Sequence, residues 1–171
     1  FLFSSGMVVV IAVMLSVAAI SLGPYQARNV RIEKMENILT SVGIESEPKT
    51  AEKIFTQYIT EQVVLNNKGE LQTGSIVAFD IDLKKELDKS KTGKQDKQLF
   101  PLFICKKDGE SFYIIPMRGK GLWGPIWGYI ALEGDMNTIA GVSFGHKGET
   151  PGLGAEIETA KFQNQLISKK I

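Results

Sequence analysis

The stretch that decides the fold is LFPLFICKKDGESFYIIPMR, residues 99–118. Its two halves are rich in Ile, Phe and Tyr, which favour β-strands, and the polar turn KDGE separates them. This pattern predicts a β-hairpin. A second hairpin is predicted in IWGYIALEGDMNTIAGVSF, residues 126–144, where GDMN forms the turn. We therefore expect an antiparallel sheet in the second half of the chain.

Helices are predicted on either side of the hairpins. Apolar residues recur every three or four positions up to Gly43 and again after Thr50, which is the spacing of one helix face. A strand is predicted at residues 75–83, the polar stretch 84–98 reads as a solvated loop, and a last helix follows a candidate N-cap, Thr159. The predicted fold class is α+β, with a mostly antiparallel sheet flanked by helices. The apolar face predicted for the helix after Thr50 consists of Ile54, Phe55, Tyr58, Ile59 and Val63.

The N-terminal segment has the composition of a membrane helix. All 39 charged residues lie at or after Arg28, and residues 1–22 are almost entirely apolar or small. Twenty-two helical residues span roughly 33 Å, enough for a bilayer core of about 30 Å. A cleaved signal peptide is the alternative, although the apolar run is long for one and no A-x-A site precedes the polar part.

The domain organisation expected from this pattern has three parts. Gly23-Pro24 is predicted to break the first helix. We expect a transmembrane helix over 1–24, an amphipathic connecting helix over 25–46 and one soluble domain over 47–171.

Composition excludes several classes of function. The net charge of +1 gives no reason to expect nucleic-acid binding. One Cys and one His can form neither a disulfide framework nor a structural zinc site, so no metal site is predicted. Cys105 lies in an apolar strand and is predicted to be a buried small side chain. We predict no catalytic residue in this chain.

The first glycine-rich segment, GKGLWG at residues 119–124, matches the G-x-G-x-x-G pattern of dinucleotide-binding folds. That pattern requires a helix to follow, whereas residues 126–130 are strand-like, so the dinucleotide interpretation fails. Two interpretations stay open. The segment is a turn between strands, or Leu122 and Trp123 present an apolar surface to a planar ligand.

The second segment, HKGETPGLG at residues 146–154, has three glycines and one proline in seven residues. A cofactor loop and a structural turn both fit it. In a cofactor loop, Glu149 offers an acceptor, Thr150 a donor and Lys147 a cation for a phosphate or a reduced ring. His146 is more typical of a hydrogen-bonded turn residue than of a ligand or a base. The candidate binding residues here are Lys147, Glu149, Thr150, Pro151, Gly152, Leu153 and Gly154.

Residues 119–157, from GKGLWG through ETPGLGAEI, closely resemble the NqrC subunit of the sodium-translocating NADH:quinone reductase, within the FMN-binding domain family. The expected membrane helix followed by one soluble domain also resembles that subunit. The H-x-x-E-T-P-G-L-G block alone would equally suit the RnfG subunit of the Rnf electron-transport complex. The segments GKGLWG and WGYIAL favour the former.

The resemblance implies a cofactor, FMN, and a role as an electron relay. It implies that residues 149–154, with Leu122 and Trp123, form the non-covalent wall of the flavin site. Family members carry the flavin as a phosphoester on a Thr of an S/D-G-A-T motif, attached by a separate flavin transferase. This chain contains no such motif, so the Thr is expected beyond Ile171, and further residues are expected at both ends of the chain.

The resemblance also implies partners and a location. The expected partners are the other membrane subunits of the reductase, the flavin transferase and the lipid bilayer. The expected location is the bacterial inner membrane, with a single span and the soluble domain on the periplasmic side. The rival interpretation is a membrane-anchored assembly module without redox chemistry.

Overall fold

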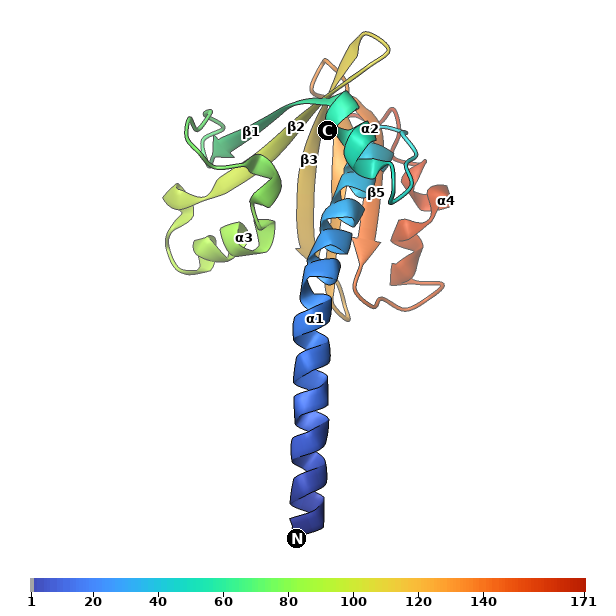
Figure 1. Cartoon of the computed structure of the whole chain (residues 1–171). Helices are drawn as coiled ribbons and strands as arrows, with labels where there is room; N and C mark the ends of the chain where they lie inside the picture. Colours follow the sequence, from blue (N-terminus) through green and yellow to red (C-terminus); the bar gives the residue numbers. More distant parts are fainter. Residues whose placement is uncertain (1) are drawn as a thin grey trace. The chain divides into compact units, whose positions relative to one another are not determined.

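The computed structural model describes residues 2–171, and the chain divides into two compact units between Lys34 and Met35. The first unit consists of the greater part of helix α1 (Leu2–Thr40), drawn in blue in Figure 1. An 18-residue window of this helix has a mean hydropathy of 2.5. By length and composition α1 is therefore able to cross a membrane.

The predicted helix break at Gly23-Pro24 is wrong, because α1 runs through Pro24 without interruption. Proline lacks an N–H and so removes one backbone hydrogen bond, but its fixed φ of about −65° suits a helix. Helices that span a membrane tolerate proline because nearby polar groups or small local adjustments of the helix satisfy the carbonyl that it frees. The separate connecting helix predicted after Pro24 is thus the continuation of α1.

The end of α1 is set by Gly43, as the sequence predicted. Gly43 adopts a φ of +67°, which glycine reaches without strain. Its N–H donates to the Thr40 carbonyl at 2.9 Å, and the Ile44 N–H donates to the Leu39 carbonyl at 3.0 Å. These two bonds form a Schellman cap that satisfies the last helical carbonyls.

The second unit is built on a five-stranded antiparallel sheet with the order β1-β2-β3-β4-β5 (Figure 1). Both predicted hairpins are confirmed, and the first turns at Asp108 and Gly109, which both have positive φ. The fold is therefore α+β, as predicted. The strands are β1 (Ile59–Asn66), β2 (Leu99–Lys107), β3 (Glu110–Lys120), β4 (Pro125–Leu132) and β5 (Ile139–His146).

Strand β1 takes the place of the second half of a predicted helix. Helix α2 (Ala51–Tyr58) stops before Ile59, and Val63 lies in the strand instead. The segment ITEQVVLN is rich in β-branched residues, and its seven pairs with β2 outweigh a local helical spacing.

Residues 75–98 also differ from the prediction. The predicted strand is a short 3-10 helix, η1 (Ala78–Asp80), which buries Phe79 in the core. The predicted solvated loop contains helix α3 (Leu83–Lys91) and the 3-10 helix η2 (Gln95–Lys97). Asp82 is the N-cap of α3, because its side chain accepts from the Lys84 N–H at 3.0 Å. This cap was not identified from the sequence, because charged residues surround it.

The core lies against one face of the sheet. Phe55, Phe79 and Phe103 meet edge to face, with ring centroids 5.5–6.4 Å apart. Cys105 is fully buried beside them, as predicted, and burial raises the pKa of its thiol to about 11.

A smaller cluster on the opposite face includes Leu132 and Val142. The 3-10 helix η3 (Gly154–Glu158) and helix α4 (Ala160–Gln163) follow β5. The Thr159 hydroxyl oxygen accepts from the Phe162 N–H, which confirms the N-cap, although α4 has only four residues.

Candidate functional site

The two glycine-rich segments lie side by side at one end of the sheet. The first forms the turn between β3 and β4, and the second leaves the end of β5. Because β4 pairs with β5, with Ile126 opposite His146, both segments emerge at the same place. The Lys147 N–H also donates to the Pro125 carbonyl at 3.1 Å, so the two backbones are joined directly.

Glu149 clamps the two segments together. Its carboxylate oxygen Oε1 accepts from the Trp123 N–H at 2.9 Å and from the Gly124 N–H at 3.2 Å. The residue is only 8% exposed, although it carries an ionisable group. Hydrogen bonds to a charged acceptor are the stronger kind and compensate for its burial.

Two glycines leave the space that the Glu149 carboxylate occupies. A Cβ at Gly121 would overlap Oε1 and lie 2.9 Å from Cδ, and a Cβ at Gly154 would lie 2.8 Å from Oε2. Neither position could carry a side chain without moving the carboxylate. Gly121 in the first segment and Gly154 in the second therefore allow close packing around one buried carboxylate.

His146 supports the clamp at the end of β5. Its ring nitrogen Nδ1 accepts from the Glu149 N–H at 3.1 Å, while Nε2 lies 3.6 Å from Oε2 of Glu158. The other oxygen of Glu158 accepts from the His146 N–H at 2.9 Å. Glu158 could not be identified from the sequence, because its link to His146 spans twelve residues and has no local pattern.

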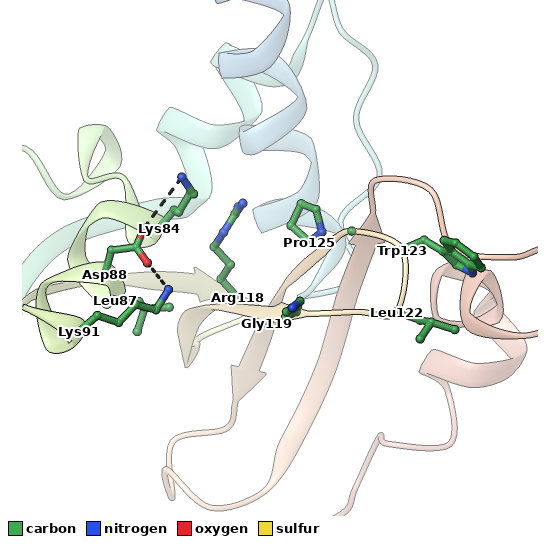
Figure 2. A pocket seen from close by; sticks show the side chains of 11 residues that line it. Lys84, Leu87, Asp88, Lys91, Arg118, Gly119, Leu122, Trp123 and Pro125 are labelled. Atoms are coloured by element: carbon green, nitrogen blue, oxygen red, sulfur yellow. Dashed lines mark hydrogen bonds and ion pairs between the residues drawn. The ribbon is translucent and has the colours of Figure 1, made fainter.

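Large apolar side chains stand exposed next to the clamp. Leu122 is 83% exposed, Trp123 is 70% exposed and Leu153 is 73% exposed. Leu122 follows Gly121 and Leu153 precedes Gly154, the two glycines that flank the Glu149 carboxylate. Figure 2 shows the side chains of Leu122 and Trp123 projecting from the far side of the turn relative to α3. These side chains give the two segments an apolar surface that no described residue covers.

The remaining predicted residues surround this surface. Thr150, Pro151 and Gly152 are exposed, and Gly152 has a φ of +74°. The Thr150 carbonyl accepts from the Leu153 N–H at 3.1 Å and so closes a tight turn. Lys147 is exposed, and its side chain lies against Gly124.

The Glu149 carboxylate, predicted to accept from a ligand, has one oxygen engaged within the protein. Oε1 is already used by two protein N–H groups, because the carboxylate is turned inward beneath the Trp123 turn. Several loop N–H groups are likewise engaged within the protein, among them that of Gly152 with Glu156 at 3.2 Å. The structure thus assigns the clamp, rather than a free array of donors, to these residues.

A cleft of about 460 Å³ lies on the α3 side of the same turn (Figure 2). Asp88 on α3 holds Lys91 at 2.6 Å and lies 3.9 Å from Lys84. The hydrogen bond from Lys91 lowers the pKa of Asp88 from its usual value. Arg118 of β3 stands between this charged group and the turn, and Leu122 and Trp123 also line the cleft, so its basic end adjoins part of the apolar surface.

The described residues contain no group of three His, Cys, Asp or Glu side chains arranged to hold a metal ion. The arrangement at the two segments instead suits a flat, largely apolar ligand. Rigid loops display aromatic and aliphatic side chains, and few polar groups accompany them.

The comparisons with known proteins identify the family to which this region belongs. The FMN-binding domain family matches residues 121–171, which include both segments from Gly121 onward. The NqrC subunit of the Na(+)-translocating NADH-quinone reductase of Vibrio vulnificus is 30% identical over 177 residues, covering 97% of this chain and 69% of the relative. The same subunit from Pseudomonas aeruginosa is 31% identical, covering 94% and 67%.

Solved structures give the same result. The crystal structure of the NqrC subunit from Parabacteroides distasonis matches with a TM-score of 0.77 and 39% identity, over 88% of this chain and 70% of that one. The NqrC structure from Shewanella oneidensis has a TM-score of 0.67 and 25% identity, over 82% and 70%. This chain belongs to the NqrC family of Na(+)-translocating NADH-quinone reductase subunits.

Proposed function

We propose that this chain is a flavin-carrying electron-relay subunit of a bacterial sodium-translocating NADH:quinone reductase. The observation that carries the proposal is the exposed apolar surface of Leu122, Trp123 and Leu153, held on two loops by Glu149. This surface lies within the region that matches the FMN-binding domain family.

The residues present fit an isoalloxazine ring. A flat ring needs apolar side chains to lie against and backbone that it can approach closely, and both are present at residues 122–123 and 150–154. The surface is exposed while its supporting carboxylate is buried, so a ligand could cover the side chains without disturbing the clamp. Leu122, Trp123 and Leu153 would hold the ring.

When bound, FMN supplies one- and two-electron transfer; the protein supplies orientation and electrostatics. Trp123 and Leu153 would exclude water from one side of the ring. The Thr150 hydroxyl is an exposed donor, and a nearby ammonium such as that of Lys147 favours negative charge on a ligand. Glu149 fixes the Trp123 turn, so the ring surface would not have to reorganise as electrons pass.

The chain would work within a membrane assembly. Helix α1 would anchor it as a single span in the bacterial inner membrane, with the domain on the periplasmic side. The other membrane subunits would be the electron donor and acceptor partners, and a flavin transferase would attach FMN to a Thr. The relatives described above are NqrC proteins, which favours this assignment over the Rnf subunit.

The test uses the native polypeptide purified from its own membrane. Its intact mass and its in-gel flavin fluorescence after SDS denaturation are measured together. A mass increment equal to FMN less one water, with fluorescence that survives denaturation, supports the relay. A colourless polypeptide without such an increment contradicts the relay and favours the assembly module.

A further inference from the structure

His146 lies next to the proposed flavin surface but has no part in it. It is the single histidine of the chain, it ends β5, and its side chain is only 15% exposed. Both of its ring nitrogens face groups of the protein. A residue needed only for a turn would not require such a large, enclosed ring.

The contacts of His146 indicate which tautomer its neutral ring adopts. Nδ1 accepts from the Glu149 N–H at 3.1 Å, and an imidazole nitrogen that accepts a hydrogen bond carries no proton. The neutral ring must then carry its proton on Nε2, which faces Oε2 of Glu158 at 3.6 Å. The charged group that Nε2 of His146 faces is therefore the carboxylate of Glu158 on η3, while Glu149 meets the ring through its backbone N–H.

Three links connect His146 with the apolar surface. Glu158 receives the His146 N–H at 2.9 Å, and His146 Nδ1 holds the N–H of Glu149. The Glu149 carboxylate in turn holds the N–H groups of Trp123 and Gly124. A chain of this kind passes the orientation of one side chain to the next.

We propose that His146 is a positioning residue for the flavin, acting through Glu149 on the Trp123 turn. The Nε2–H form of the imidazole fixes the Glu149 backbone, and this backbone places the carboxylate that holds the turn. The inference rests on the proposed function, because it assumes that Trp123 faces the ring. Losing the Nδ1 acceptor would loosen both loops together.

The test compares two variants of the native, flavin-carrying polypeptide. His146→Asn keeps an acceptor oxygen close to the position of Nδ1, whereas His146→Phe keeps the ring volume and removes the acceptor. Hydrogen exchange of the Glu149, Trp123 and Gly124 amides is followed alongside the flavin absorbance and midpoint potential. Lys53→Gln, at an exposed position on α2, is the matched control.

We expect His146→Phe to speed exchange at the Glu149 amide about tenfold, the effect of one lost hydrogen bond, and to shift the flavin potential. His146→Asn should restore both values toward wild type. Unchanged exchange in His146→Phe, or an Asn variant that behaves like the Phe variant, overturns the inference. Altered exchange with an unaltered potential and spectrum also overturns a role toward the flavin.

A measurement on the wild type guards against variants that do not fold. ¹⁵N-labelled histidine gives ring signals, and those of His146 are assigned through their correlation with the His146 backbone. We expect Nδ1 to be unprotonated and Nε2 protonated at neutral pH, and the opposite tautomer overturns the inference. Absence of flavin from the wild type, by contrast, contradicts the proposed function, and the tautomer measurement distinguishes the two failures.

Discussion

Gly121→Ala tests the clamp with a single methyl group. A Cβ at this position would overlap Oε1 of Glu149, and it would lie 2.9 Å from Cδ of Glu149 and 3.0 Å from Cγ2 of Ile126. The distance to Cδ is shorter than carbon atoms tolerate, and the distance to Cγ2 requires the partly enclosed Ile126 side chain to shift by a few tenths of an ångström. The carboxylate must therefore move, and it leaves the N–H groups of Trp123 and Gly124.

The expected loss follows from those two bonds. A hydrogen bond to a charged group contributes about 1.5–3 kcal/mol, and the lower value applies here because the turn is partly exposed. Two such bonds give about 3 kcal/mol. Replacing glycine by alanine lowers the conformational entropy of the unfolded chain, which stabilises the folded state by about 0.4–1 kcal/mol where the backbone conformation is allowed. We expect the free energy of unfolding to fall by about 2 kcal/mol.

Gly148→Ala is the matched control. Gly148 lies in the same loop, has nothing within 4 Å of its added Cβ, and, like Gly121, does not have a positive φ. Urea unfolding in detergent, followed by tryptophan fluorescence, measures both variants. Equal stability of the two would refute the clamp. A second check introduces Gly121→Ala into the Glu149→Ala variant. Because the carboxylate is absent there, the added methyl group should change the free energy of unfolding little.

Three further predictions concern other parts of the domain. Asp135 accepts from the Thr138 hydroxyl at 2.6 Å, and this bond lowers its pKa to about 2. Asp135→Asn should therefore destabilise the domain above pH 4, with a difference that shrinks as the pH falls towards 2, measured by thermal melts across pH. Cys105 is buried with a pKa raised to about 11, so thiol reagents should label it only at the rate of unfolding, as mass spectrometry can follow. Trp123→Ala and Leu153→Ala should alter the flavin spectrum while changing the free energy of unfolding by less than about 0.5 kcal/mol, because both side chains are exposed; equal spectra would exclude them from the flavin surface.

The hairpins could be predicted because the residues that determine each of them are close together in the sequence. Residues 99–118 contain both strands and the turn that fixes their register, so no distant residue was needed. The helix cap at Gly43 is local in the same way. Strand β1 could not be predicted, because Val63 meets helical spacing within its own segment and pairs with Leu102 only in the folded sheet.

The two loops of the candidate site could be located from the sequence, but their hydrogen bonding could not. The glycines of 119–124 and 146–154 mark both loops, and exposed Trp123 and Leu153 agree with a binding surface. The inward turn of Glu149 depends on the pairing of β4 with β5, which brings a residue 26 positions away to Trp123. The spacing of residues within either loop does not predict the contact between Glu149 and Trp123.

The flavin position is tested most directly by an electron-density map of the native, flavin-carrying polypeptide. We predict that the isoalloxazine ring lies on Leu122, Trp123 and Leu153, with the Glu149 carboxylate still bound to the Trp123 and Gly124 N–H groups. A ring that lies against Arg118 and α3 at the other end of the cleft and leaves Leu153 uncovered would contradict this placement.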